Sequence, residues 1–390
     1  MPTAIDRYDV AVVGLGLIGS AALRHAATGG HRAIGFGPAE PPVFAAHAGA
    51  FASHYDSGRI TRHVDPHLEW AELARRAIAE YPTIEAEGEP FHRPVGLIYA
   101  VTEAEQADVL RRVMAELGHG VAWREVDGSP DPRVRVADGA TSFVEDGPAG
   151  HIDPRRLVRA QLTAAGRRGA RIVRAEVRSL ERSGDGWRVV LRDGRSVEAA
   201  RVVVACGPHA DEIDGVAMPT IDVIAETVLT GELDTDEQAR LHGLPSIITP
   251  VEHPVYDSCY FVPPTPYPDG SIRLKIGAGT IVERHVRTAA ERRAWMRGDD
   301  HQAELEPLSE VLHELLPGLR TTDERTTPCL IAYNASGFPV IDHVDDGVVA
   351  VAGCNGYAAK SSDAIGALAV SLAIDGVWRD ALPHQPFRLG

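Results

Sequence analysis

The fold of this chain is decided by the stretch Tyr8-Asp9-Val10-Ala11-Val12-Val13-Gly14-Leu15-Gly16-Leu17-Ile18-Gly19. Its apolar half suits a strand buried on both faces of a parallel sheet. In its glycine half, Gly14 allows a tight turn, Gly16 lets backbone approach a pyrophosphate, and Gly19 lets the next helix pack on the strand. Amide donors and the positive helix end then face an anion. An ordinary strand–helix turn also fits the spacing, but the place between a strand and a helix favours a dinucleotide site.

The second strand is expected over Arg32–Phe36, and an acidic residue near its end would hold the ribose of a dinucleotide. Here Gly37-Pro38-Ala39 follows the strand, and the nearest carboxylate is Glu40. Either Glu40 reaches back to the ribose, or the ribose is held through backbone atoms and water.

Composition narrows the function classes. A chain of 390 residues that is 44% hydrophobic can bury a large core and is expected to form two domains. The net charge of -16 argues against nucleic acid or an anionic membrane as a partner. No apolar run is long enough to span a bilayer, and residues 1–7 lack a signal-peptide pattern. We therefore expect a cytoplasmic, monomeric protein that acts on a small molecule.

Cysteine and lysine usage is sparse. The four cysteines (Cys206, Cys259, Cys329 and Cys354) lie far apart without metal-type spacing, so we predict no metal site. Among 39 lysines and arginines, the only lysines are Lys275 and Lys360. Such a bias suggests that lysine is kept where a compact, deprotonatable ammonium is needed. The alternative is two ordinary surface lysines.

The rest of the chain alternates helices and strands. Helices are expected over residues 66–81, 153–166, 292–316 and 362–374, and strands over 170–180, 202–206 and 348–353. Between Ile221 and Ile281, strand-like runs alternate with Pro- and Asp-rich loops, which suits an antiparallel sheet in a separate substrate domain. The segment Ser53–His63, rich in arginine and histidine, is either a solvated loop or a loop laid over a cofactor.

Four stretches together resemble the monomeric sarcosine oxidase and N-methyltryptophan oxidase family, within the D-amino-acid-oxidase-like flavoenzymes. They are the glycine fingerprint, Arg59-Ile60-Thr61-Arg62-His63, Leu274-Lys275-Ile276-Gly277, and Cys329 followed at the family's distance by Gly353–Ser362. The resemblance covers almost the whole chain. The last two stretches are the most specific, because they place both lysines and one cysteine at the family's functional positions.

The resemblance implies an α/β protein (α+β overall) that binds FAD. Its Rossmann-like FAD-binding domain would consist of residues 1–85, 145–218 and 322–390. A substrate domain with a largely antiparallel sheet would consist of residues 86–144 and 219–321.

The resemblance also implies roles for single residues. Cys329 would be bonded to the isoalloxazine ring, although a buried structural thiol is the alternative. Arg62 and Lys360 would bind the substrate carboxylate through charge-assisted hydrogen bonds. Arg59 would lie beside the flavin, and Lys275 near its N5 atom would promote the reaction with oxygen. Tyr260 would lie over the substrate. Further FAD contacts are expected at Gly14, Gly16, Leu17, Ile18, Gly19, Gly37, Ser53, His54, Val177, Ala205, Cys206, Gly207, Asn355, Gly356, Tyr357 and Lys360.

Departures from the family pattern fall mostly in the pocket walls. Family histidines are replaced by Gly279 and Tyr357, a tyrosine by Ile331, and the second of two loop histidines by Tyr55. Gly279 makes room and Ile331 makes the space more apolar. These changes favour a larger or cyclic secondary amine over sarcosine, with Tyr55, Ile331, Gly356 and Tyr357 among the substrate-binding residues.

The implied activity is FAD-dependent oxidation of the C–N bond of a secondary α-amino acid to an imine, with O2 reduced to H2O2. The alternatives are a flavin dehydrogenase or desaturase that acts on a modified amino acid in a biosynthetic pathway, a flavin-binding module without activity, and a nicotinamide dehydrogenase of similar fold. Lys275 favours the oxidase, because a dehydrogenase has no use for an oxygen site.

Overall fold

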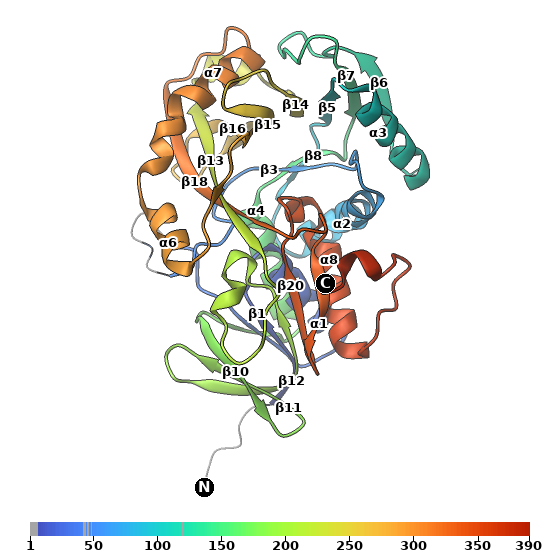
Figure 1. Cartoon of the computed structure of the whole chain (residues 1–390), viewed down its shortest axis with the longest axis vertical. Coiled ribbons are helices and arrows are strands. Elements are labelled where there is room, and N and C mark those ends of the chain that lie inside the picture. Colours follow the sequence, from blue (N-terminus) through green and yellow to red (C-terminus); the bar gives the residue numbers. More distant parts are fainter. Residues whose placement is uncertain (1–6, 42–43, 45–46, 48, 119) are drawn as a thin grey trace.

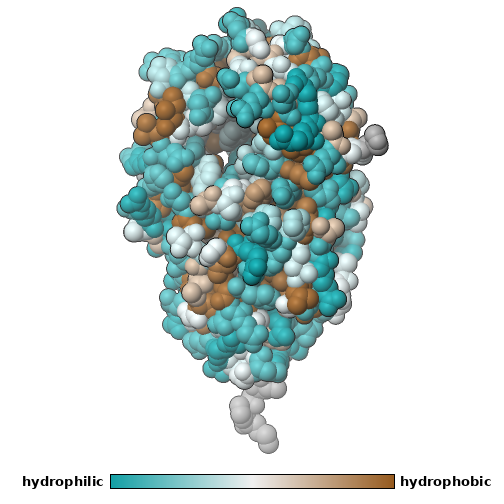
Figure 2. Space-filling model, turned by 45° about the vertical axis from the view of Figure 1, so that its right-hand side comes forward, coloured by the Kyte–Doolittle hydropathy of each residue, from teal (hydrophilic) through white to brown (hydrophobic). Residues whose placement is uncertain are grey.

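The computed structural model describes residues 7–41, 44, 47, 49–118 and 120–390. Residues 1–6, on which the expectation of no signal peptide depends, lie outside the described residues. Figure 1 shows an elongated molecule with one large sheet in its lower half and a second in its upper half. On the face in Figure 2, hydrophobic residues are scattered among hydrophilic ones. None of the helices within the described ranges has the length and apolarity needed to cross a bilayer.

The lower sheet contains the predicted strand at its centre. Its order is β10-β11-β12-β1-β2-β9, with β20 beside β12 and β19 beside β20. β2, β1, β12 and β20 are mutually parallel where they pair. The strands are β1 (Arg7–Val13), β2 (Ala33–Phe36), β9 (Arg171–Val173), β10 (Val177–Ser183), β11 (Gly186–Leu191), β12 (Ser196–Val204), β19 (Val340–Asp345) and β20 (Val348–Ala352).

Helices cover the lower sheet and form its core with it. α1 (Leu17–Thr28) packs against α4 (Pro154–Arg167) and α8 (Ala358–Asp375), and α8 also packs against α2 (Leu68–Glu87). The apolar face predicted within residues 66–81 is buried in this core, including Trp70 and Tyr81. α4 begins as expected, because the Asp153 carboxylate accepts a hydrogen bond from the Arg156 amide.

The upper sheet has the order β17-β13-β16-β15-β14-β5-β7-β6, with β18 beside β13. Every pairing is antiparallel except that of β14 with β5. The strands are β5 (Leu97–Val101), β6 (Trp123–Asp127), β7 (Thr141–Glu145), β13 (Asp222–Glu232), β14 (Ser246–Pro250), β15 (Tyr256–Pro266), β16 (Ile272–Thr280), β17 (Arg284–His285) and β18 (Asp323–Tyr333). The predicted fold class is thus confirmed.

Shorter elements complete the fold. A small sheet of order β3-β8-β4 is formed by β3 (Arg59–Thr61), β8 (Gly150–Ile152) and β4 (His92–Arg93). The remaining helices are α3 (Ala104–Leu117), α5 (Thr235–Arg240), α6 (Ala289–Arg297) and α7 (Leu305–Leu315), with short 3-10 turns η2 (Gly207–Glu212), η3 (Asp300–Glu304) and η4 (Gln385–Phe387).

Two predicted elements are wrong in extent. Residues 170–180 form two strands, because β9 pairs with β2 whereas β10 pairs with β11. Residues 292–316 form α6, η3 and α7, because Gly298 at the end of α6 adopts an extended backbone. The domain division stays a prediction. β18, assigned to the FAD-binding domain, pairs along its length with β13 of the upper sheet.

Candidate active site

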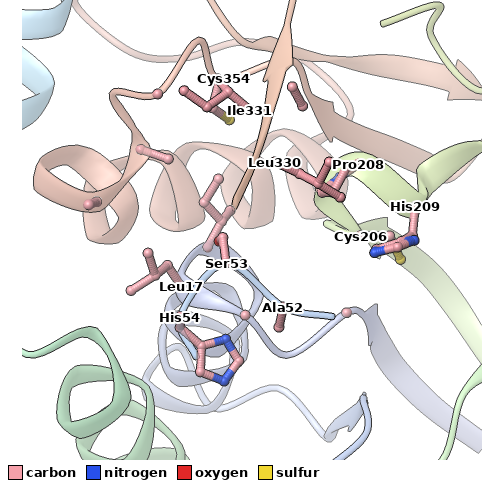
Figure 3. A pocket seen from close by; sticks show the side chains of 18 of the residues that line it. Leu17, Ala52, Ser53, His54, Cys206, Pro208, His209, Leu330, Ile331 and Cys354 are labelled. Atoms are coloured by element: carbon pink, nitrogen blue, oxygen red, sulfur yellow. The ribbon is translucent and has the colours of Figure 1, made fainter. Parts of the chain in front are cut away.

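One large cavity, of about 850 Å³, is lined from both large sheets. The C-terminal ends of β1 and β20 and the turn that follows β12 contribute to it from the lower sheet, and β13, β15, β16 and β18 contribute from the upper sheet. Such a position beyond the carboxyl ends of parallel strands is where open α/β sheets bind ligands. In Figure 3, side chains from distant segments, among them Leu17, His54, Cys206 and Ile331, surround this space.

Most of the predicted site residues meet in this cavity. Its lining includes Gly14, Gly16, Leu17, Ile18, Gly37, Ser53, His54, Tyr55, Arg59, Arg62, Val177, Ala205, Cys206, Gly207, Tyr260, Cys329, Ile331, Asn355, Gly356, Tyr357 and Lys360. Gly19 and Lys275 do not line it.

The glycine fingerprint has the geometry of a dinucleotide loop. Gly14 has a φ of +94°, and a Cβ atom there would lie 2.4 Å from the Ala205 carbonyl oxygen. A Cβ atom at Gly19 would lie 1.7 Å from the Gly14 carbonyl oxygen, which explains how α1 approaches the turn so closely. Gly16 is the N-cap residue of α1 and, having no side chain, makes no capping hydrogen bond. The N-terminus of α1 therefore leaves amide donors for a ligand in the cavity.

His54 faces the same loop. Its Nδ1 atom is buried without a hydrogen-bond partner in the described part of the chain, and it lies 3.8 Å from where a Gly16 Cβ would be. Burial, reinforced by Arg155, lowers the pKa of His54 to about 3, so the ring is neutral. An unpaired buried ring nitrogen beside a glycine turn and an uncapped helix fits a polar ligand with a pyrophosphate, and thus fits FAD.

Glu40 is not placed to bind the ribose of a dinucleotide. The Glu40 side chain is paired with Arg155, which also donates to the Ser57 hydroxyl at 2.8 Å, and Glu40 does not line the cavity. The alternative in which backbone atoms hold the ribose is therefore the better supported one.

Arg62 and Lys360 come together on one buried carboxylate, which the sequence analysis missed. Asp65 Oδ2 lies 2.6 Å from Lys360 Nζ and 2.8 Å from Arg62 Nη1, and Asp65 is 0% exposed. We call these three residues the Asp65 cluster. Its net charge of one positive unit suits an additional anion. In the sequence, this ion pair could have been found from the spacing of three residues between Arg62 and Asp65.

The local environment holds this cluster in place. The Glu145 carboxylate accepts hydrogen bonds from the backbone amides of His63 and Val64 and from the His63 ring. The Tyr357 ring lies 5.5 Å from the Arg62 guanidinium and 5.4 Å from Lys360 Nζ. Burial lowers the pKa of Lys360 to about 8, against the opposing effect of Asp65. Burial raises the pKa of Asp65, but Lys360 and Arg62 outweigh it and hold that pKa below its usual value.

The second lysine belongs to a parallel arrangement, the Asp56 cluster of Asp56, Arg59 and Lys275. Lys275 Nζ lies 2.8 Å from Asp56 Oδ2 and also donates to the Gly58 carbonyl, while Arg59 pairs with the same Asp56 oxygen. Lys275 is 1% exposed, and its ammonium lies 5.6 Å from the centre of the Tyr260 ring. Burial, followed by the charge of Arg59, lowers the pKa of Lys275 to about 8. Both lysines of the chain are therefore buried ion-pair partners, which removes the surface alternative.

Cys329 differs from the other cysteines in its surroundings. An Arg59 Nη atom donates to its Sγ at 3.8 Å, and the Trp295 indole donates to its backbone carbonyl at 2.9 Å. Burial raises the pKa of Cys329, and Arg59 opposes this. Burial raises the pKa of Cys206 and of Cys354 to about 12 without a nearby cation among the causes. Cys329 is thus the cysteine with a cation positioned to stabilise a thiolate.

The remaining walls divide between the two ends of the cavity. The Tyr55 hydroxyl donates to the Ala39 carbonyl at 3.3 Å, and its ring contacts His54, so its neighbours are those of the dinucleotide loop. Ile331 lies opposite Gly356, 3.8 Å from where a Gly356 Cβ would be. A second acidic group that the sequence analysis missed, Glu226, also lines the cavity.

Comparisons with known proteins agree with this geometry. A family described as FAD dependent oxidoreductase matches residues 9–372. The tRNA 5-methylaminomethyl-2-thiouridine biosynthesis bifunctional protein MnmC of Burkholderia mallei is 32% identical over 222 residues, which are 54% of this chain and 32% of that protein. The chain thus matches about a third of the length of this curated relative.

Solved structures match the whole chain. The open form of NikD, an unusual amino acid oxidase essential for nikkomycin biosynthesis, has a TM-score of 0.76 at 20% identity and covers 98% of each chain. L-proline dehydrogenase from P. horikoshii has a TM-score of 0.75 at 16% identity, also over 98% of each chain. At these identities the likeness shows the fold. With the family match over residues 9–372, it follows that the chain belongs to the FAD-dependent oxidoreductases of the D-amino-acid-oxidase-like group.

Proposed function

We propose that this protein is an FAD-dependent amine oxidase of the sarcosine oxidase type. Its substrate would be a secondary α-amino acid with an N-methyl, N-alkyl or cyclic nitrogen. The amino acid would lose two electrons and two protons to become an imine, and O2 would take them up as H2O2. The observation that carries the proposal is the Asp65 cluster, with Arg62 and Lys360 both on the cavity wall.

The cluster would act on the substrate by binding its carboxylate. Besides Asp65, Arg62 donates to the Val64 carbonyl and Lys360 to the Trp70 carbonyl. Each side chain still keeps an N–H donor for a second anion. Two such donors orient the carboxylate and thereby the neighbouring C–N bond. The backbone carbonyl of Gly356 would accept from the neutral amine, and the rings of Tyr260 and Tyr357 would enclose the substrate.

FAD would occupy the cavity from the fingerprint to β18, and when bound it supplies the electron acceptor for the amine and passes electrons to oxygen. Gly14, Gly16 and the N-terminus of α1 would hold its pyrophosphate. Cys329 would anchor it covalently, helped by the Arg59 guanidinium beside the sulfur. Arg59 would counter negative charge at the ring, and Lys275 would serve the reaction with oxygen.

The contacts of Lys275 favour a second candidate, a flavin dehydrogenase or desaturase in a biosynthetic pathway. Lys275 does not line the cavity, and its ammonium is bound to Asp56 and to the Gly58 carbonyl. Such a lysine is a structural ion-pair partner unless it reaches the cavity through a water molecule. A dehydrogenase would reduce an added dye but release little peroxide.

We also propose a small-molecule substrate, and not a tRNA as the name of the curated relative suggests for that protein. A net charge of -16 gives little electrostatic attraction for a phosphate backbone. Adding tRNA to the assay would test this, because a nucleic-acid substrate would start turnover where free amino acids do not.

The test is peroxide release by the purified flavoprotein in air. The panel contains N-methyl amino acids, proline, pipecolate and fructosyl amino acids, each beside the same amine without its carboxylate. Turnover of the carboxylated members only is expected. Equal turnover of the decarboxylated partners would refute the Asp65 cluster as the carboxylate site. Dye reduction without peroxide would replace the oxidase with the dehydrogenase.

A further inference from the structure

Glu226 is an acidic side chain in the cavity wall with no part in the proposed reaction. It lies in β13, directly opposite Cys329 in the register with β18. It lines the cavity together with Tyr260, Ile331 and Tyr333. In the described part of the chain it makes no hydrogen bond or ion pair. The side chain is partly buried, so its carboxyl group faces the cavity without a protein partner and can pair with a ligand there.

The charged groups that act most strongly on Glu226 cannot supply that partner, because they are acidic as well. The Arg59 guanidinium, which contacts Cys329, is already paired with Asp56. Glu304 of η3, Glu283 before β17 and Asp257 of β15 all act on Glu226. Glu304 is itself engaged by the Thr227 hydroxyl at 2.8 Å and the Tyr256 hydroxyl at 2.9 Å. The uncharged titratable groups on the same side are Tyr256, Tyr260, Cys329 and Tyr333. Burial and then Glu304 raise the pKa of Glu226 to about 8.

The cavity wall therefore carries both cationic groups and an acidic group. The Asp65 cluster presents two cations, Arg62 just after β3 and Lys360 of α8, and β13 presents an unpaired carboxyl group. We propose that Glu226 binds a basic group of the substrate, so that the substrate is an α-amino acid with a second, protonated nitrogen beyond the reacting amine. This inference rests on the proposed function, because it takes the carboxylate to be bound by Arg62 and Lys360.

The reacting amine is a poorer partner for Glu226. Oxidation next to nitrogen needs the neutral amine, and a carboxylate beside it would favour the protonated form. A distal ammonium carries no such conflict, and it would be held by β13 while Arg62 and Lys360 hold the substrate carboxylate. A hydrogen bond between charged groups of this kind is worth roughly tenfold or more in affinity.

The test compares two N-methyl amino acids of similar length, Nα-methyllysine and Nα-methylnorleucine, on the holoenzyme at pH 8.5. The native protein is expected to prefer the lysine derivative in kcat/KM by tenfold or more. Glu226→Gln should abolish the preference through KM and leave turnover of the norleucine derivative within about twofold. Glu283→Gln is the matched control, since Glu283 is an exposed carboxylate near Glu226 that does not line the cavity, and it should keep the preference. An equal loss for both substrates in Glu226→Gln would overturn the inference.

Binding provides a readout independent of turnover. Thioether acids, in which sulfur replaces the reacting nitrogen, are compared with and without a terminal amine by calorimetry. Because the pKa of Glu226 is about 8, the preference for the amine-bearing acid should grow as pH rises from 6.5 to 9 and stay flat in Glu226→Gln. A terminal ammonium keeps its charge over this range, with an ordinary pKa of about 10.4. Equal affinities overturn the inference, whereas the expected binding without any oxidation of the lysine derivative refutes only the proposed function.

Discussion

Replacing Asp65 with Asn keeps the shape of the side chain and removes the one negative charge of the Asp65 cluster. Asp65 is fully buried, and Lys360 Nζ and Arg62 Nη1 lie 2.6 and 2.8 Å from its carboxylate. Removing one partner of a buried ion pair lowers the free energy of unfolding by about 3–5 kcal/mol, because the remaining charge is left uncompensated. In Asp65→Asn two cations lose their partner, so we expect the free energy of unfolding to fall by an amount at the upper end of that range. A substrate carboxylate could then replace the missing anion.

Urea unfolding of the holoprotein measures both effects, with and without a thioether acid that cannot be oxidised. At 100 times its Kd this ligand should stabilise the native protein by about 2.7 kcal/mol. In Asp65→Asn the ligand should bind tenfold or more tightly, since the charge of Asp65 no longer offsets part of the positive charge of the two cations. Asp146→Asn is the control, because Asp146 is an exposed partner of Arg124 and its loss should change little. The reasoning is refuted if Asp65→Asn unfolds like the native protein and binds the acid no more tightly.

Three further predictions concern the reaction. Lys275→Met should slow reoxidation of the flavin by about 100-fold and slow its reduction far less. In the native protein, reoxidation should slow as the pH rises through about 8, because Lys275 then loses its proton. Equal losses in stopped-flow measurements of both half-reactions would contradict an oxygen role. Lys360→Met should raise KM by roughly tenfold or more, because one carboxylate donor is lost; steady-state kinetics with an unchanged KM would remove it from the carboxylate site. Cys329→Ser should release its flavin when the protein is denatured, whereas the native flavin should stay with the polypeptide on a denaturing gel; free flavin from both would leave Cys329 a structural thiol.

Local patterns predicted much of the fold. The apolar run, the glycine spacing and the Asp153-Pro154 cap depend on contacts between near neighbours, and the structure contains β1, α1 and α4 where they were expected. Other predicted elements had wrong boundaries, because the strands with which a segment pairs decide where each strand begins and ends. Nothing local in residues 170–180 indicates that one half pairs with β2 and the other with β11.

The carboxylates of the site show the same limit. Arg59, Arg62, Lys275 and Lys360 stood out through the family pattern and the scarcity of lysine. No pattern in the sequence singled out Asp56 or Asp65, and Glu226 was one acidic residue in an apolar strand. The role of Asp56 and Asp65 depends on which cations lie next to them in the folded chain. The role of Glu226 depends on its having no cationic partner within the described residues.

By itself, the sequence determined the class of the protein: a dinucleotide fold, a second antiparallel sheet and a set of cations suited to a carboxylate. Turn geometry, strand burial and residue chemistry depend on a few consecutive residues, so they can be read along the chain. Only the tertiary structure decided how the charges are paired. The Asp65 cluster joins residues 295 positions apart in the sequence. Glu226 lines the cavity because β13 pairs with β18, which brings Glu226 opposite Cys329. The energy of a buried charge depends on its neighbours in space, and the folded chain alone brings those neighbours together.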